Sequence, residues 1–145
     1  MEELLLDQTF VKSEPTNYAG FWIRFGAAFI DGLITTVAGF TILFVTGGSF
    51  QNQSPIYSLI DLLIPWIYAA AMESSERQAT LGKIAVGIKV TDMNGDRISF
   101  GKATGRHFAK FISAIILLIG YIMAAFDAKK QALHDKMAGT LVLNK

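Results

Sequence analysis

The chain has 145 residues, enough for one domain, and its formal net charge of +1 is close to neutral. This charge gives no basic surface of the kind that binds nucleic acid, and no nucleic-acid-binding motif is present. Cysteine is absent, which excludes disulfides and cysteine-based metal or redox sites. Apolar residues make up 52% of the chain, and charged residues are sparse in three windows at 21–45, 56–72 and 108–126.

Residues 1–17 form a polar lead-in, and the first apolar window, residues 21–45, follows them. A membrane-spanning helix needs about 20 apolar residues, and this window supplies them. It also contains Arg24 and Asp31. If the helix begins at Phe21, Asp31 lies ~15 Å deep, near the middle of a ~30 Å hydrocarbon core. A carboxylate there costs on the order of 2.5–3.5 kcal/mol, so Asp31 is a candidate functional residue or a structural carboxylate bonded to a neighbouring helix.

The second window, residues 56–72, contains Asp61 and Pro65. A proline inside a helix frees the carbonyl four residues earlier, which here belongs to Asp61. If this helix returns antiparallel to the first, Pro65 lies at a depth similar to that of Asp31. Two carboxylates and a freed carbonyl would then form a cation or proton site. The alternative is a hydrated Asp61 near the membrane surface, with Pro65 as a simple kink.

Residues 73–107 are polar and basic. Apolar and polar residues alternate from Ile88 to Phe100, and Asn94-Gly95 between them is a strong tight-turn signal. This pattern predicts a small β-hairpin. The loop at 46–55 carries no Lys or Arg, so the positive-inside rule places that loop outside and the hairpin in the cytoplasm.

The third apolar window, residues 108–126, is interrupted at Gly120, and a basic tail follows at 127–145. A full third span would place the lysines of this tail outside, against the positive-inside rule. A re-entrant segment broken at Gly120 would instead keep the tail inside, where GTLVLNK could pair with the hairpin. Both alternatives stay open. The predicted fold is an all-α membrane protein of about three hydrophobic helices with a small cytoplasmic β-hairpin.

Three segments together carry a resemblance: the first window, TLGKIAVGIKVTDMNGDRISF and the terminal LHDKMAGTLVL. They resemble the RDD family of small membrane proteins, over residues 18–143. The family is named for an arginine and two aspartates. Arg24 and Asp31 match the first two, and the second aspartate is Asp135 or Asp127. Asp135 is the natural partner for Arg24, because both belong near one membrane surface if the tail is cytoplasmic.

The resemblance implies a multi-pass protein of the plasma membrane with a transport role. Sodium/proton exchange is proposed for some family members, and a eukaryotic relative is linked to assembly of a membrane protein complex. We therefore expect exchange of a small cation for protons, by a homo-oligomer because three spans are few for a transport path. The alternative is a non-catalytic adaptor that binds a partner through its basic hairpin and tail.

The candidate functional residues are Arg24, Asp31, Asp61 and Asp135, with Pro65 and Gly120 as hinges. No nucleophile–base arrangement is present, so we do not expect an enzyme. His107 and His134 lack metal-ligand spacing, and no cofactor or metal site is predicted. The expected partners are the lipid bilayer, further copies of the chain, a small cation and protons.

Overall fold

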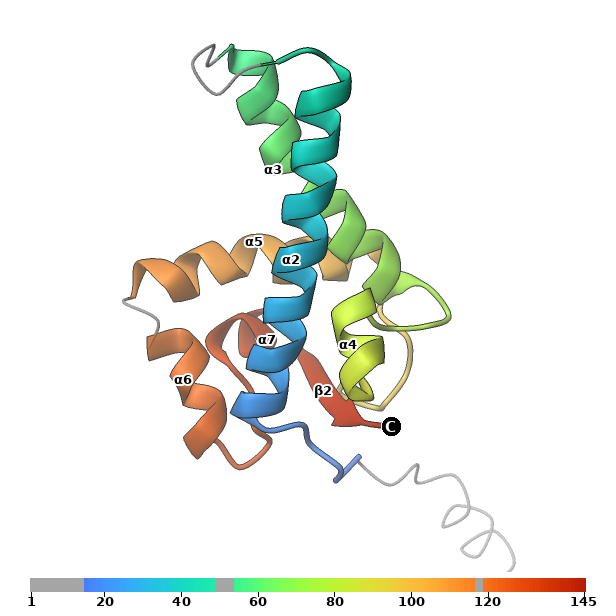
Figure 1. Cartoon of the computed structure of the whole chain (residues 1–145). Helices are drawn as coiled ribbons and strands as arrows, with labels where there is room; N and C mark the ends of the chain where they lie inside the picture. The colour runs from blue at the N-terminus through green and yellow to red at the C-terminus, as the bar shows by residue number, and fades with distance from the viewer. Residues whose placement is uncertain (1–14, 49–53, 117–118) are drawn as a thin grey trace, which may run out of the picture.

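The computed structural model describes residues 15–48, 54–116 and 119–145. Two long helices, α2 (Phe21–Val45) and α3 (Pro55–Ser74), run antiparallel and project from the rest of the molecule (Figure 1). Both are long and apolar enough to cross a membrane, which confirms the first two predicted spans. Most of the predicted lead-in, residues 1–14, lies outside the described residues.

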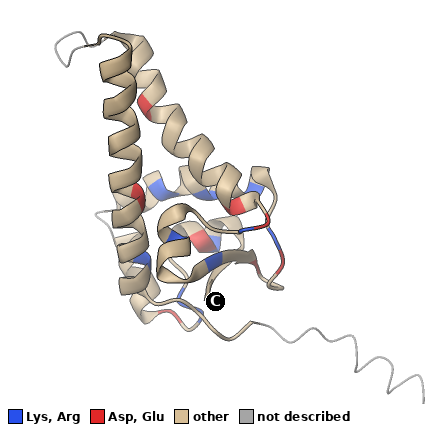
Figure 2. Cartoon of the chain, turned by 45° about the vertical axis from the view of Figure 1, so that its right-hand side comes forward, with Lys and Arg blue, Asp and Glu red and all other residues tan. Residues whose placement is uncertain are grey.

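One face of α2 is apolar and exposed along the whole helix. Large side chains recur on it every three or four residues: Trp22, Phe25, Phe29, Leu33, Val37, Phe40 and Phe44. Only Ala27 of this helix is buried. Lipid hydrocarbon is the solvent that favours such a continuous apolar face. Figure 2 shows charged residues gathered at the other end of the molecule, with the outer half of the helical pair almost free of them.

The third apolar window forms two helices, α5 (Phe100–Ile115) and α6 (Ile119–Phe126), that are bent by 102° relative to each other. The break therefore precedes Gly120, which we expected to be the hinge. Gly120 lies inside α6, and a Cβ built on it would lie 2.8 Å from the Cβ of Ser113 on α5. The missing side chain thus lets α5 and α6 pack closely. Gly120 therefore serves close packing and not the hinge that we predicted.

Helix α5 has a polar inner face and an apolar outer face. Its buried residues are Ala103, Arg106, Ala109 and Ser113, whereas Phe111 is 48% and Ile115 is 78% exposed. This is the reverse of a soluble amphipathic helix, in which the charged face lies outside. An apolar environment around α5 explains the reversal.

The β-structure differs from the predicted hairpin. Strand β1 (Ile88–Asp92) pairs antiparallel with β2 (Thr140–Asn144) at the carboxyl end, with Val90 opposite Val142. A tight turn follows β1, and Gly95 adopts a φ of +84° there, but no second strand follows the turn. The reason is Ser99, whose side chain accepts a hydrogen bond from the amide of Lys102 and begins α5.

The pairing of β1 with β2 also determines how the third apolar window is arranged. Strand β1 precedes α5 and β2 follows α6, so the α5–α6 segment begins and ends on the same side of the molecule. The amide of Ala19, just before α2, donates to the carbonyl of Val142 at 2.8 Å on that side as well. The chain thus has two helices that can span a membrane and a bent pair, α5–α6, whose return to one side suits a re-entrant segment.

Each strand follows a six-residue helix and a glycine. Helix α4 (Leu81–Val86) ends at Gly87 and leads into β1, and α7 (Leu133–Ala138) ends at Gly139 and leads into β2. Both glycines are left-handed, with φ of +73° and +64°, a conformation that side chains disfavour. The two helix–glycine–strand units therefore meet through their strands, and each presents its helix to the long helices.

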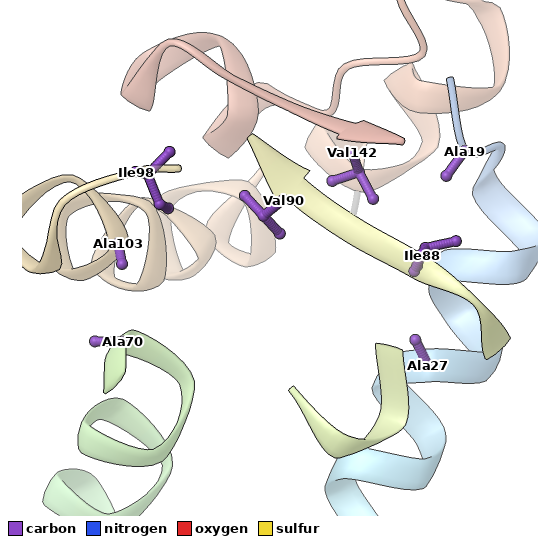
Figure 3. Close-up of a cluster of buried hydrophobic side chains, with 8 residues drawn as sticks. All are labelled: Ala19, Ala27, Ala70, Ile88, Val90, Ile98, Ala103 and Val142. Atoms are coloured by element: carbon purple, nitrogen blue, oxygen red, sulfur yellow. The ribbon is translucent and has the colours of Figure 1, made fainter. Parts of the chain in front are cut away.

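The core beneath these units is built mainly from small residues. Figure 3 shows Ile88, Val90 and Val142 on the strands, Ala27, Ala70 and Ala103 on the helices, and Ala19 and Ile98 on the segments just before α2 and α5. Alanines let backbones approach closely, as in other helix contacts within membranes. The close approach brings the charged residues at the inner ends of the helices within bonding distance.

Gly82 on α4 gives a test of this packing. A Cβ at Gly82 would lie 2.2 Å from the carbonyl oxygen of Ala27 on α2, and backbone cannot easily move away. We expect Gly82→Ala to lower the free energy of unfolding by ~1–3 kcal/mol or more, measured by melting in detergent. The control is Gly105→Ala on α5, where nothing lies within 4 Å. A Gly82→Ala protein as stable as the Gly105→Ala protein would contradict the packing.

Candidate functional site

A network of buried charges lies where the helices meet the two-stranded sheet, and Arg106 of α5 is at its centre. Its Nη1 donates to both oxygens of Glu73 at 2.8 and 2.9 Å, and its Nε donates to Oδ1 of Asp135 at 2.9 Å. The three residues are no more than 2% exposed. One guanidinium thus joins the inner end of α3 to α7.

Two more cations complete this buried ion network. Lys83 of α4 donates to Oε1 of Glu73 at 2.6 Å, and Arg24 of α2 forms an ion pair with Oδ2 of Asp135. The expected contact between Arg24 and Asp135 is therefore present. Arg24 also donates to the carbonyls of Ala19, at 3.0 Å, and Lys130. Five helices each contribute one charged residue: α2, α3, α4, α5 and α7.

Asp135 has a further role at the start of α7, where it accepts a hydrogen bond from the amide of Ala132 at 3.0 Å. Burial raises the pKa of this carboxyl, but Arg106 and Arg24 outweigh burial and hold the pKa well below its usual range. The other candidate aspartate, Asp127, instead pairs with Lys136 at 2.6 Å near the surface. Of the two, Asp135 is the one that meets Arg24.

The neighbouring His134 is buried beside the same carboxylate. Its Nδ1 lies 3.5 Å from Oγ of Ser113, and its Nε2 lies 3.5 Å from Oδ1 of Asp135. Burial, together with the positive charge of Arg106, lowers the pKa of His134 to about 3. The imidazole is therefore neutral in the folded protein at physiological pH.

Asp31 lies at a second polar site, where α4 begins beside α2. Its Oδ1 accepts hydrogen bonds from the Tyr68 hydroxyl and the Gly82 amide, both at 2.8 Å. Its Oδ2 accepts from the Thr80 hydroxyl at 2.5 Å. All three donors are neutral, and within the described residues Asp31 forms no ion pair. It therefore differs from Glu73 and Asp135, whose charges are balanced by bonded cations.

A cavity of about 580 Å³ connects the two sites. Its polar lining includes the Asp31 site, with Thr35, Tyr68 and Thr80, and residues of the ion network together with His107, Lys110, Tyr121 and His134. Apolar residues of α2, α3, α5 and α6, with Val142 of β2, line the remainder. Such a cavity, apolar with a few convergent polar groups, is the usual form of a binding site.

Asp61 and Pro65 are placed differently from each other. Pro65 lines the cavity, but Asp61 is exposed on α3 and is not part of the lining. The residue of α3 that reaches Asp31 is Tyr68, seven positions beyond Asp61 and about 10 Å further along the helix axis. Asp31 and Tyr68 lie at the same level because each is about four turns from the outer end of its helix. The structure does not bring Asp61 to Asp31.

Several residues of the site were not found from the sequence. Arg106 had a usable signal, because it follows Ala103 and precedes Ala109 by three residues and so shares their buried stripe. Glu73 and Lys83 had none, since both belong to the segment 73–107, whose many charged residues gave no sign of which ones are buried. Tyr68 and Thr80 are ordinary uncharged residues whose role depends on the position of Asp31.

The model of the RDD family matches residues 18–139. The chain belongs to the RDD family. Its similarity to other bacterial proteins extends over most of its length. The uncharacterized protein YxaI of Bacillus subtilis (strain 168) is 38% identical over 88% of this chain and 97% of its own. The uncharacterized membrane protein YteJ of the same organism is 33% identical over 88% of this chain and 81% of its own.

A further relative comes from another bacterium. The proline-rich antigen homolog of Mycobacterium tuberculosis (strain CDC 1551 / Oshkosh) is 30% identical over 90% of this chain and 65% of its own. No solved structure matched this RDD protein. The name of YteJ describes a membrane protein, in agreement with the two long apolar helices.

The pairing of Arg24 with Asp135 predicts coupled effects of their removal. Arg24→Ala or Asp135→Ala leaves buried charges unpaired, at roughly 3–5 kcal/mol for a fully buried pair. We expect the double variant to be less destabilised than the sum of the single variants, with a coupling of ~0.5–3 kcal/mol, measured by melting in detergent. The control is the same set of single and double alanine variants for Lys136 and Asp127, whose side chains are 41% and 18% exposed. Its coupling should stay below ~1 kcal/mol, and strict additivity for Arg24 and Asp135 would contradict the pairing.

The neutral His134 predicts that acid destabilises the protein. Below pH ~6.5 the unfolded chain protonates this imidazole, but the folded protein with its pKa of about 3 does not, so stability falls as the pH falls. The expected loss from this group is ~2 kcal/mol between pH 7 and pH 5. His134→Gln should flatten the dependence of the melting temperature on pH. Lys136→Gln, which changes an exposed residue two positions further along the chain, should not. An unchanged slope in His134→Gln would refute this assignment.

Proposed function

We propose that this RDD protein exchanges a small cation for protons across the plasma membrane, with Asp31 as the residue that binds both. The observation that supports the proposal is the environment of Asp31. It is a carboxylate on a membrane-spanning helix, it lines the cavity, and within the described residues no basic side chain pairs with it. An ionisable group in such a place marks a functional site by default.

The groups around Asp31 suit a hard cation. The hydroxyls of Tyr68 and Thr80 both donate to its carboxylate, and rotation of either hydroxyl would present an oxygen lone pair instead. Thr35, which also lines the cavity, lies one turn further along α2 and donates to the carbonyl of Asp31 at 3.0 Å. Carboxylate, hydroxyl and carbonyl oxygens are the ligands that hard cations prefer.

Exchange then follows from competition for one carboxylate. When Asp31 is protonated it carries no charge, and when the proton leaves, a cation takes its place beside the ionised carboxylate. Each cycle therefore moves one proton against one monovalent cation. Two spans and a re-entrant segment are few for a complete path, so we propose that two or more copies associate in the bilayer.

Ion flux in proteoliposomes tests the proposal. A pH-sensitive dye inside the vesicles should report alkalinisation or acidification when a sodium or potassium gradient is imposed. We expect Asp31→Asn to abolish this coupled flux while leaving the protein folded, because the amide keeps the shape and part of the hydrogen bonding but cannot titrate. Asp31→Glu should retain part of the flux.

The matched control is Asp61→Asn, which removes the exposed carboxylate on the partner span and should leave the flux unchanged. Coupled flux at the wild-type rate in folded Asp31→Asn would show that this carboxylate is structural and holds α4 against α2. No flux in the wild type, together with a partner protein recovered by crosslinking, would favour the adaptor instead.

A further inference from the structure

The end of the cavity beside α5 carries a cation without a bonded partner. Lys110 lines the cavity, and among the described residues its ammonium forms no hydrogen bond or ion pair. His107, one turn before it on the same face of α5, has a buried Nδ1 that also lacks a hydrogen-bond partner within the described chain. Buried polar groups are normally satisfied, so the unpartnered Nδ1 of His107, one turn from a lysine without an ion pair in the same cavity, indicates a missing ligand.

The charges around Lys110 show which sign this ligand has. The ion network holds three cations, Arg24, Lys83 and Arg106, against Glu73 and Asp135, and is positive by itself. Lys110 adds a further positive charge, and its electrostatic interactions are with members of this network. Asp31, which lines the same cavity, offsets one charge and leaves the whole site at +1. An uncompensated charge in a dry site is costly, and an anion would remove the cost.

The mouth of the cavity shows from where such an anion could enter. Phe25 of α2 and Ile122 of α6 both line the cavity, yet they are 57% and 45% exposed. The cavity therefore opens between these two helices, among apolar side chains of the face assigned to lipid. A headgroup on Lys110 would leave its acyl chains in contact with this apolar mouth.

We infer that this end of the cavity binds the oxyanion of an acidic membrane lipid, with Lys110 as the charged anchor and His107 as a hydrogen-bonding neighbour. The shared chemistry is a phosphate group, which a soluble phosphate could also supply. The apolar mouth favours the lipid. This inference does not rest on the proposed cation exchange, because neither Lys110 nor His107 touches the oxygens around Asp31.

Melting of the full-length protein in detergent tests the site. The protein is titrated with dioleoylphosphatidylglycerol, with dioleoylphosphatidylcholine or with inorganic phosphate. We expect the acidic lipid to raise the melting temperature by several degrees and the zwitterionic lipid to have little effect. Lys110→Met should weaken the response to the acidic lipid roughly tenfold or more, because a charge-assisted contact is lost. Lys110→Arg should keep it.

The matched control is Lys102→Met, which removes an exposed lysine from the same helix away from the cavity and should respond like the wild type. If Lys110→Met fails to fold, Ala114→Leu takes its place, since it narrows the same cavity wall without changing a charge. A response to inorganic phosphate that depends on Lys110 would support the site and identify a soluble phosphate as its ligand. The inference would be overturned if the two lipids raised the melting temperature equally and phosphate did not raise it. It would also be overturned if folded Lys110→Met, or Ala114→Leu in its place, responded to the acidic lipid as the wild type does.

Discussion

The bonds that Arg106 makes to Glu73 and Asp135 are the constraint on which the rest of the structure depends. They join the inner end of α3 to α7, and Lys83 and Arg24 extend the connection to α4 and α2. In a soluble protein a hydrophobic core would hold five helices together. Here the outer faces of the long helices are apolar and face lipid, so apolar contact between them gains little. Charge-assisted hydrogen bonds, which are strong where water is excluded, supply the attachment.

This arrangement explains why α5 is polar inside and apolar outside. Arg106 and Lys110 point into the molecule, where the ion network and the cavity lie, while Phe111 and Ile115 cover its outer surface. Removing one partner of such a network leaves a charge without compensation. The fold therefore requires a nearly complete set of charges, and Lys110 is the one cation in the described part of the site that no bonded carboxylate balances.

Asp31 connects the fold to the proposed activity. Its bonds to Thr80 and Gly82 hold the start of α4 against α2, and the bond to Tyr68 fixes α3 at the same level. All these donors are neutral, so within the described residues no bonded cation balances the charge of this carboxylate. A structural bond and a binding function are thus compatible at one residue, provided that the hydroxyls can reorient.

The sequence by itself determined the two long spans, the positions of Arg24 and Asp31 within the first one, and the family. Runs of about 20 apolar residues leave few alternatives in a bilayer, because each backbone group must be bonded within its own helix. The pairing of Arg24 with Asp135 was also accessible, since a buried arginine needs a carboxylate on the same side of the membrane.

Only the tertiary structure decided the strand pairing, the level of Asp61 and the partners of Arg106. The alternation from Ile88 to Phe100 specifies a strand but not its neighbour, and the helix start at Ser99 competes with a second strand. Asp61 does not lie beside Asp31, where it had been expected. The level at which two helices face each other is set by their packing, not by position in the sequence. Glu73, Arg106 and Asp135 are far apart along the chain, and a local pattern cannot show that one guanidinium joins them.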